Sequence, residues 1–210
     1  MPDFLMYLRE ACVENLAEAI QAEKQGADRL ELCSRLDLDG LTPSFNLVRQ
    51  VLDNVSIPVM VMIRPRAGDF EYSEQELDEM KREIVAFKNL NIAGFVFGVL
   101  SSQHIDIGRT RSLAELASPF EICFHKAIDE VEDIIEAVEQ LADIKQITRI
   151  LTSGGASTAE KGIGTLQQMI DTASGKISIM PAGKIRPENI DLLHQKLNAI
   201  EYHGRSIVVK

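Results

Sequence analysis

Residues 29–33 read Arg-Leu-Glu-Leu-Cys, so charged or thiol side chains alternate with leucines. Successive side chains of a β-strand point to opposite faces, which places Arg29, Glu31 and Cys33 on one face and the two leucines on the other. The central strands of an open doubly wound sheet are apolar on both faces and do not alternate in this way. The alternation favours a closed barrel, in which one face of each strand packs on helices and the other points into a lumen.

Similar short runs recur along the chain, separated by amphipathic stretches of helical period such as Ser73–Asn91 and Val131–Ala142. Repeated units of this kind, with short connections and no linker, are typical of a parallel sheet covered by helices. The sequence therefore predicts a (β/α)8 TIM barrel that forms a single domain over residues 1–210. The eight strands are expected near Leu8–Val13, Arg29–Cys33, Pro58–Arg64, Ala93–Val99, Phe120–His125, Ile147–Thr152, Lys176–Pro181 and Ala199–His203.

Inward-facing positions carry both signs of charge, with four glutamates against four arginines, which is close to the neutrality that buried ions require. These residues are Glu10, Glu31, Glu121 and Glu201, and Arg29, Arg64, Arg66 and Arg149. Only Gly204–Lys210 follow the eighth strand, so the last helix is expected to be short or missing. The groove left bare predicts a homo-oligomer, because monomers seldom expose a large apolar surface.

The composition disfavours several classes of partner. A formal net charge of -10 is unsuited to nucleic acid or to an anionic membrane surface, both of which require a cationic field. No apolar run approaches the roughly 18 residues that a membrane helix needs, so no membrane partner is expected. Three widely spaced cysteines fit a reducing compartment better than a disulfide framework, and we expect a cytoplasmic protein.

The carboxyl ends of the strands are where barrel enzymes carry their functional groups. Arg64 and Arg66 lie at the end of the third strand, with Asp69 in the next turn, and two guanidinium groups suit a carboxylate or a phosphate. His125 ends the fifth strand and is expected to face Glu31, a pairing suited to acid–base chemistry near neutral pH. We therefore treat Glu31, Arg64, Asp69 and His125 as candidate catalytic residues and Arg66 as anion-binding. An ion-pair network that only neutralises Glu31 is the alternative.

The loops after the sixth and seventh strands are rich in glycine and resemble the late-loop phosphate sites of many barrels. Their candidate anion-binding residues are Ser153, Gly154, Gly155 and Gly183. The alternative is that the glycines only supply the backbone conformations that such turns need. Ser157 and Glu160 have the spacing of a capping box and predict the start of the next helix.

The cysteines support a second interpretation. Cys12 and Cys33 lie on neighbouring predicted strands at positions of equal parity, with Met60 and Met62 on the next strand. Thiolates and thioethers are soft ligands that favour Cu(I), so the two cysteines are candidate metal ligands. The alternative is ordinary packing, because cysteine and methionine are common in buried cores.

Several segments together give the chain a specific resemblance to the CutC family, named for copper homeostasis. The most distinctive, residues 61–70, reads Val-Met-Ile-Arg-Pro-Arg-Ala-Gly-Asp-Phe, and the others are residues 10–14, 26–34, 40–44, 96–100 and 149–155. The resemblance implies a (β/α)8 barrel, a cytoplasmic oligomer and a Cu(I) role for the positions of Cys12 and Cys33. The chain departs from the family pattern at Lys126, at residues 181–184 and in its shorter tail.

Two functions stay open on this basis. The first is a CutC-like copper homeostasis protein that binds Cu(I) through its barrel cysteines and otherwise has no cofactor. The alternative is a TIM-barrel enzyme, an isomerase, lyase or hydrolase, that acts on a small anionic or phosphorylated substrate at the C-terminal rim. The expected partner is accordingly a copper ion or a small anionic ligand.

Overall fold

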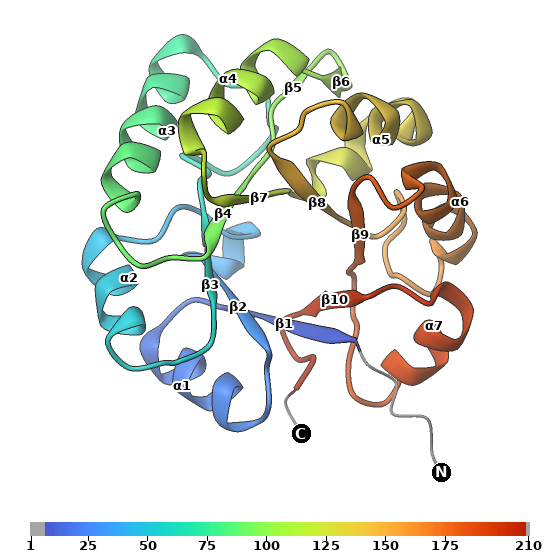
Figure 1. Ribbon diagram of the computed structural model, residues 1–210, viewed down its shortest axis with the longest axis horizontal. Helices are drawn as coiled ribbons and strands as arrows, with labels where there is room; N and C mark the ends of the chain where they lie inside the picture. Colours follow the sequence, from blue (N-terminus) through green and yellow to red (C-terminus); the bar gives the residue numbers. More distant parts are fainter. Residues whose placement is uncertain (1–6, 209–210) are drawn as a thin grey trace.

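The computed structural model describes residues 7–208 and forms a ring of parallel strands surrounded by helices (Figure 1). Each strand overlaps its predicted position, and the predicted (β/α)8 barrel is confirmed. The strands of the ring are β1 Leu8–Val13, β2 Arg29–Leu32, β3 Val59–Met62, β4 Gly94–Phe97, β7 Glu121–Phe124, β8 Ile147–Thr152, β9 Ser178–Pro181 and β10 Glu201–Gly204.

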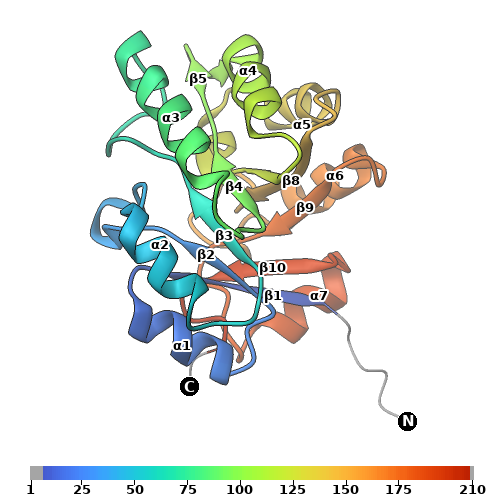
Figure 2. The same ribbon diagram turned by 60° about the vertical axis from the view of Figure 1, so that its left-hand side comes forward.

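The ring is nearly closed. Its hydrogen-bonded order is β10-β1-β2-β3-β4-β7-β8-β9, and every neighbouring pair in that order is parallel. The remaining gap lies between β9 and β10, which run beside each other in both views (Figures 1 and 2). The chain therefore returns to its starting strand, because β10 pairs with β1.

Helices connect successive strands on the outside of the ring. They are α1 Leu16–Lys24, α2 Phe45–Leu52, α3 Glu74–Phe87, α4 Ile107–Ala117, α5 Ile134–Ala142, α6 Ile163–Ala173 and α7 Ile190–Leu197, with short 3₁₀ helices at Leu36–Leu38 and Lys126–Glu130. A small hairpin of β5 Leu100–Ser101 and β6 His104–Ile105 precedes α4. Residues 205–208, which follow β10, form turns and bends rather than a helix. None of the helices described over residues 7–208 is both long and apolar enough to cross a membrane.

The sequence predicts one capping box, at Ser157 and Glu160, and the structure shows a different one. Ser73 caps α3, and the reciprocal contact with Glu76 forms a complete capping box. The predicted box at Ser157 and Glu160 is wrong, because α6 begins only at Ile163. Glu160 instead accepts a hydrogen bond from the side chain of Asn189, so it is not available to cap a helix.

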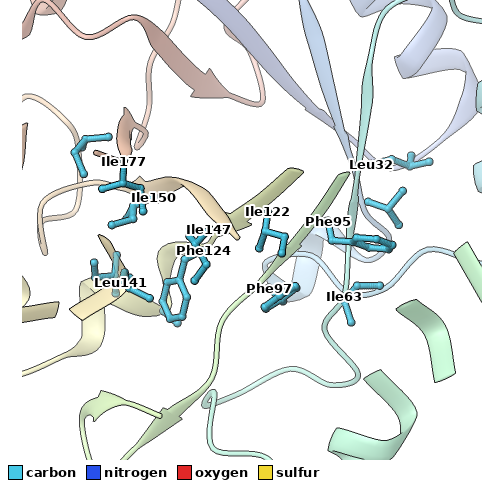
Figure 3. Close-up of a cluster of buried hydrophobic side chains, with 14 of the residues drawn as sticks. Leu32, Ile63, Phe95, Phe97, Ile122, Phe124, Leu141, Ile147, Ile150 and Ile177 are labelled. Carbon is cyan, nitrogen blue, oxygen red and sulfur yellow. The ribbon is translucent and has the colours of Figure 1, made fainter. Parts of the chain in front are cut away.

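The barrel has two distinct cores, as the alternation of the strands predicts. The outer core lies between strands and helices, and Figure 3 shows a part of it that includes Leu32, Phe95, Phe97, Ile122 and Phe124. The inner core fills the lumen and is rich in sulfur; it consists of Cys12, Cys33, Met60, Met62, Val96, Cys123, Leu151, Met180 and Ala182. Neighbours in sequence such as Leu32 and Cys33 thus belong to different cores.

A network of ion pairs closes the lumen near the amino ends of the strands. Arg29 is 4% exposed and contacts the carboxylates of both Glu10 and Glu201, the latter at 2.6 Å. Arg149 lies 3.2 Å from Glu201 and 2.8 Å from Glu121. Because each buried charge has a partner of opposite sign, the polar residues are tolerated inside the barrel. Glu121 lies at the edge of this network, since it pairs with Arg149 while half of its side chain is exposed.

Candidate functional site

A cavity of about 570 Å³ opens at the carboxyl ends of the strands. Its wall combines strand ends with the loops that follow them, which is the end where barrel enzymes carry their sites. The lining residues are Cys12, Glu31, Leu36, Asp37, Leu38, Asp39, Met62, Arg64, Ala67, Gly68, Phe70, His125, Lys126, Asp129, Glu130, Leu151, His203 and Arg205. The structure therefore brings the predicted Cys12, Glu31, Arg64 and His125 to one place.

Acidic side chains outnumber basic ones around this cavity. Five carboxylates line it against three cationic side chains, with both histidines counted as neutral. Each cationic group is already engaged: Arg64 by backbone carbonyls, Lys126 by Asp129 at 3.5 Å, and Arg205 by Glu14 at 3.2 Å. By formal charge the lining therefore has a small excess of negative groups, which suits a cation better than an anion.

Two thiols meet at the inner end of the cavity. The register pairs Val13 of β1 with Leu32 of β2, and the Cys33 amide then donates to the Val13 carbonyl, so the last residues of both strands lie side by side. The Sγ atoms of Cys12 and Cys33 are 3.6 Å apart, and both thiols are free and buried. Contact with Cys33, burial and the neighbouring Glu31 carboxylate all raise the pKa of Cys12 above its ordinary value. The Cys12 thiol therefore keeps its proton until a cation displaces it.

A histidine and two glutamates adjoin the thiols. His203 on β10 donates from Nδ1 to Glu10 Oε1 at 2.9 Å, and its Nε2 lies 3.7 Å from Glu31 Oε2. Burial opposes ionisation of Glu10, but the hydrogen bond from His203 and the charge of Arg29 outweigh it and lower its pKa to about 2. Burial raises the pKa of Glu31, and Glu31 Oε1 has no hydrogen-bond partner.

Arg64 is held almost entirely by the backbone. Its Nη1 lies within 3.3 Å of the carbonyl oxygens of Leu38, Asp39 and Gly40, and its Nη2 donates to the Gly68 carbonyl at 2.9 Å. The guanidinium also stacks over the ring of Phe70, at 4.7 Å from its centre. Only Nε has no partner. Arg64 thus fixes the loops that form the wall of the cavity and has one donor left for a ligand.

His125 is buried against the same aromatic ring. Its ring centre lies 4.8 Å from that of Phe70, and its Nδ1 accepts a hydrogen bond from the Ala127 amide at 3.3 Å. Burial, together with the charge of Arg64, lowers the pKa of His125 to about 3. The imidazole is therefore neutral with its proton on Nε2, which has no partner. Acid–base exchange near neutral pH does not fit such a group, whereas hydrogen-bond donation does.

The predicted partners Arg66 and Asp69 lie away from the cavity. Arg66 donates to the carboxylates of Glu76 at 2.6 Å and Asp69 at 2.8 Å, and its other donors go to three backbone carbonyls. Arg66 is also not an inward residue as predicted, since β3 ends at Met62 and the alternation of a strand does not extend into the loop. Nothing in the geometry brings Arg66 or Asp69 toward Arg64 and His125.

The loop amides predicted to bind an anion already hold one. The carboxylate of Asp129 accepts hydrogen bonds from the amides of Ser153 and Gly155 at 2.9–3.1 Å, and from the hydroxyls of Thr152 and Ser153. The Gly154 amide donates to the Thr152 hydroxyl. The side chain of Asp129 thus occupies the place that a phosphate takes in other barrels.

Gly183 serves packing in this structure. A side chain there would come 3.1 Å from both the Ala159 backbone and Ser153 Cβ, and φ is +101°. The Gly183 carbonyl accepts from the Ala159 amide, which joins the two late loops. The alternative interpretation of this glycine, a conformational requirement, therefore explains it without a ligand.

Asp129 and His203 are the functional neighbours that the candidate list lacks. Asp129 follows His125 by four residues within a 3₁₀ helix, and nothing in that spacing shows that it reaches the next loop. The parity of β10 does place His203 on the same face as Glu201, but only the closure of the ring brings it beside Glu10 on β1. Ring closure is a property of the whole sheet rather than of any one strand.

Comparisons with known proteins agree with this architecture. The sequence profile described as "CutC family" matches residues 7–208. A copper homeostasis protein cutC homolog of Homo sapiens is 41% identical over 198 residues, covering 94% of this chain and 72% of that protein. A homologue of the same name from Dictyostelium discoideum is 39% identical, covering 92% of this chain and 80% of that protein.

Solved structures give the same result. The crystal structure of a copper homeostasis protein CutC from Streptococcus agalactiae matches with a TM-score of 0.90 at 32% identity, covering 96% of this chain and 100% of that one. A dihydrodipicolinate synthase from Cyanidioschyzon merolae matches with a TM-score of 0.68, covering 96% of this chain and 70% of that one. At 11% identity the second match shows a shared barrel fold alone. By profile, by sequence and by structure, the chain belongs to the CutC family.

Proposed function

We propose that the protein handles copper as a cargo and binds Cu(I) through the thiols of Cys12 and Cys33. One observation carries this proposal: the two sulfur atoms lie 3.6 Å apart, and one of the two cysteines, Cys12, lines the open cavity. Thiolates are the protein ligands that favour Cu(I) over harder cations. The relatives named copper homeostasis proteins support the same function.

The surroundings of the thiols suit a cation. Glu31 Oε1 is buried without a partner beside them, an arrangement that costs free energy unless a donor or a metal satisfies it. Met62 also lines the cavity, so its thioether is within the same space, whereas Met60 lies deeper, beside Arg149. The acidic opening attracts cations toward this donor set.

Substitution of the thiols tests the proposal. Titration of Cu(I) against a chromophoric chelator should show that Cys12→Ser combined with Cys33→Ser abolishes tight binding. Cys123→Ser is the matched control, because Cys123 is a third buried thiol of the same inner core. Arg64→Ala should leave Cu(I) affinity unchanged, since soft thiolate coordination does not use a guanidinium group. Full Cu(I) affinity in the thiol-free protein would refute the proposal.

An enzyme acting on a small anionic or phosphorylated substrate is the second candidate, and one observation favours it. Arg64 Nε and His125 Nε2 are buried donors without partners, and both side chains pack on Phe70 at the cavity wall. Unmatched donors of this kind suit an oxygen ligand. Calorimetry with inorganic phosphate tests this candidate: binding that Arg64→Ala abolishes would support it, and no heat from the folded wild-type protein would refute it.

We propose further that the chain forms a single domain and acts in the cytoplasm as a homo-oligomer. Three free thiols are typical of a reducing compartment. Ile200, which is 69% exposed, lies directly before β10, the strand that pairs with β1, and gives a contact surface to a second copy. Light scattering at micromolar concentration tests the assembly, and a monodisperse monomer would refute it.

A further inference from the structure

We propose that residues 35–40, in the loop between β2 and α2, form a strap that seals Cys33 from the cavity, and that Arg64 is the latch that keeps the strap closed. Opening of the strap would let a ligand reach both thiols, and closing would hold it there. The strap thus regulates access to the thiol site, and it rests on the proposed function for the identity of the ion that passes. Its opening can be measured on the protein alone.

The strap lies directly against the thiol pair. Cys33 is 0% exposed and, unlike Cys12, does not line the cavity. Leu36 of the strap packs on the sulfur-rich inner core. A Cβ atom added at Gly40, the last residue of the strap, would lie 3.4 Å from both Cβ and Sγ of Cys33. The open cavity therefore reaches one thiol of the pair, and a ligand that needs both needs this loop to move.

The backbone of the strap has a fixed base and strained ends. Ser34 and Leu41 pair as an antiparallel bridge, each amide donating to the other's carbonyl at 2.7–2.8 Å. Just inside this base, Arg35 and Asp39 have φ of +52° and +62°, in the left-handed region that most side chains disfavour, and Gly40 follows at +87°. Backbone of this kind costs free energy and persists where surrounding contacts hold it.

Packing gives the strap little support of its own. The side chains of Arg35 and Asp37 are 60% and 63% exposed, and their ion pair is internal to the strap. Asp39 is exposed, and Leu36 and Leu38 are half-buried. Loops with few buried contacts open locally at a low cost in free energy, so polar tethers decide whether this strap stays closed.

Arg64 is the main tether. Its Nη1 lies 3.2–3.3 Å from the carbonyl oxygens of residues 38–40, and its Nη2 donates to the Gly68 carbonyl at 2.9 Å. The guanidinium thus joins the strap to the loop that follows β3, through bonds that a charged donor makes stronger. At the other end of the strap, the Leu36 amide donates to a carboxylate oxygen of Glu14 at 2.9 Å. Arg64 makes most of these contacts, so its loss should free the loop.

The latch acts on the rate of access and leaves the affinity of the site alone. The empty and the loaded protein both have the strap closed, so Arg64 stabilises the two states equally. A contact that is equal in both states does not shift the binding equilibrium. Replacing Arg64 should therefore change how fast the thiols exchange a ligand, and the Cu(I) affinity expected for Arg64→Ala under the proposed function is unaltered.

Thiol labelling tests the strap on the metal-free protein. N-ethylmaleimide is added at several urea concentrations, and peptide mass spectrometry follows each cysteine separately. Below the unfolding transition, the rate at Cys33 should hardly depend on urea, because local opening exposes little surface. Cys123 is the internal comparison, since it is 1% exposed and lies on β7, three strands from β2 in the ring. Its rate should rise with urea as global unfolding does.

Two substitutions should loosen the strap by different routes. Arg64→Lys should speed labelling of Cys33 at least about 10-fold, because an ammonium group cannot bridge both loops and one or more charged hydrogen bonds are lost. Gly40→Ala keeps the guanidinium but penalises the φ of +87°, and should speed labelling about 5- to 30-fold. Gly175→Ala is the matched control: its φ of +74° carries a similar penalty outside the strap, and Cys33 should label at the wild-type rate.

Two results would overturn the strap. One is a wild-type protein in which Cys33 and Cys123 label with the same dependence on urea, because global unfolding would then be the step that exposes both. This measurement needs no substitution, so it holds even where a variant fails to fold. The other is labelling of Cys33 at the wild-type rate in folded Arg64→Lys and Gly40→Ala proteins.

The outcomes also separate the strap from the proposed function. If Cu(I) binding depends on Cys12 and Cys33 but Cys33 labels through global unfolding alone, the strap is wrong and the copper proposal stands. If local opening exposes Cys33 but the thiol-free protein keeps its Cu(I) affinity, the copper proposal is wrong and the strap stands.

Discussion

Replacing Asp129 tests whether its carboxylate stands in for a bound anion. Asp129→Ala would leave the amides of Ser153 and Gly155 without an acceptor, while the hydroxyls of Thr152 and Ser153 can rotate to others. The side chain of Asp129 is only 12% exposed, so water replaces it poorly. At roughly 1–3 kcal/mol for each stranded amide, we expect a loss of about 4 kcal/mol in the free energy of unfolding.

The empty position in that variant should then bind an anion from solution. Sulfate at about 100 times its dissociation constant would restore about 2.7 kcal/mol, which chemical denaturation with and without sulfate can measure. Glu130→Ala is the matched control, because it removes the same charge from an exposed neighbour that makes none of these contacts. A loss below about 1 kcal/mol, or equal stabilisation of wild type and variant by sulfate, would refute the reasoning.

Three further predictions concern His125, Glu83 and Gly98. The pKa of His125 is about 3 in the folded protein against 6.5 in model peptides, so its contribution to stability is present above pH 6.5 and is lost as pH falls toward 3. In acid denaturation, His125→Gln should therefore lose less stability than the wild-type protein over this range, by up to about 5 kcal/mol. Burial raises the pKa of Glu83 to about 7, so its contribution to stability is present below pH 4.5 and is lost as pH rises through 7. In urea titrations at pH 8, Glu83→Gln should therefore be more stable than the wild-type protein by on the order of 1 kcal/mol. Gly98→Ala would bring a methyl 2.7 Å from His125 Nδ1 and should cost about 1–3 kcal/mol in thermal unfolding, whereas Gly164→Ala, with nothing within 4 Å, should not.

A different result would contradict each of these three predictions. Parallel acid-denaturation curves for wild type and His125→Gln would show that the folded imidazole titrates normally. A stability difference for Glu83→Gln that does not change between pH 4.5 and 8 would show that its carboxyl is well solvated. Equal effects of the two glycine substitutions would show that the wall of the cavity yields to an added methyl group.

The fold was predictable because its determinants are local. The alternation at residues 29–33 indicates which side chains enter the lumen. The same period recurs in the other strands of the ring, except at the start of β8, where a register shift against β7 puts Ile147 in the outer core and Arg149 in the lumen. The reasoning failed where that period stops. Arg66 shares parity with Arg64 in the sequence, but β3 ends at Met62, and its guanidinium turns outward to Glu76.

The candidate site was predictable only in part, because half of it depends on contacts between distant segments. Cys12, Glu31 and Cys33 come from neighbouring strands and meet as parity predicts. By contrast, the carboxylate of Asp129 fills the loop after β8, and His203 reaches Glu10 only when the last strand pairs with the first. A glycine-rich loop has the same sequence pattern whether a phosphate or a side chain occupies it.

The ion pairs among Glu10, Arg29, Glu201 and Arg149 give the barrel a floor. These ion pairs block the lumen near the amino ends of the strands, so an ion that enters the cavity at the carboxyl ends cannot cross the barrel and leave at the opposite end. Under the proposed function, copper would therefore enter and leave on the same side of the barrel, and the protein would act as a carrier of the ion and not as a channel.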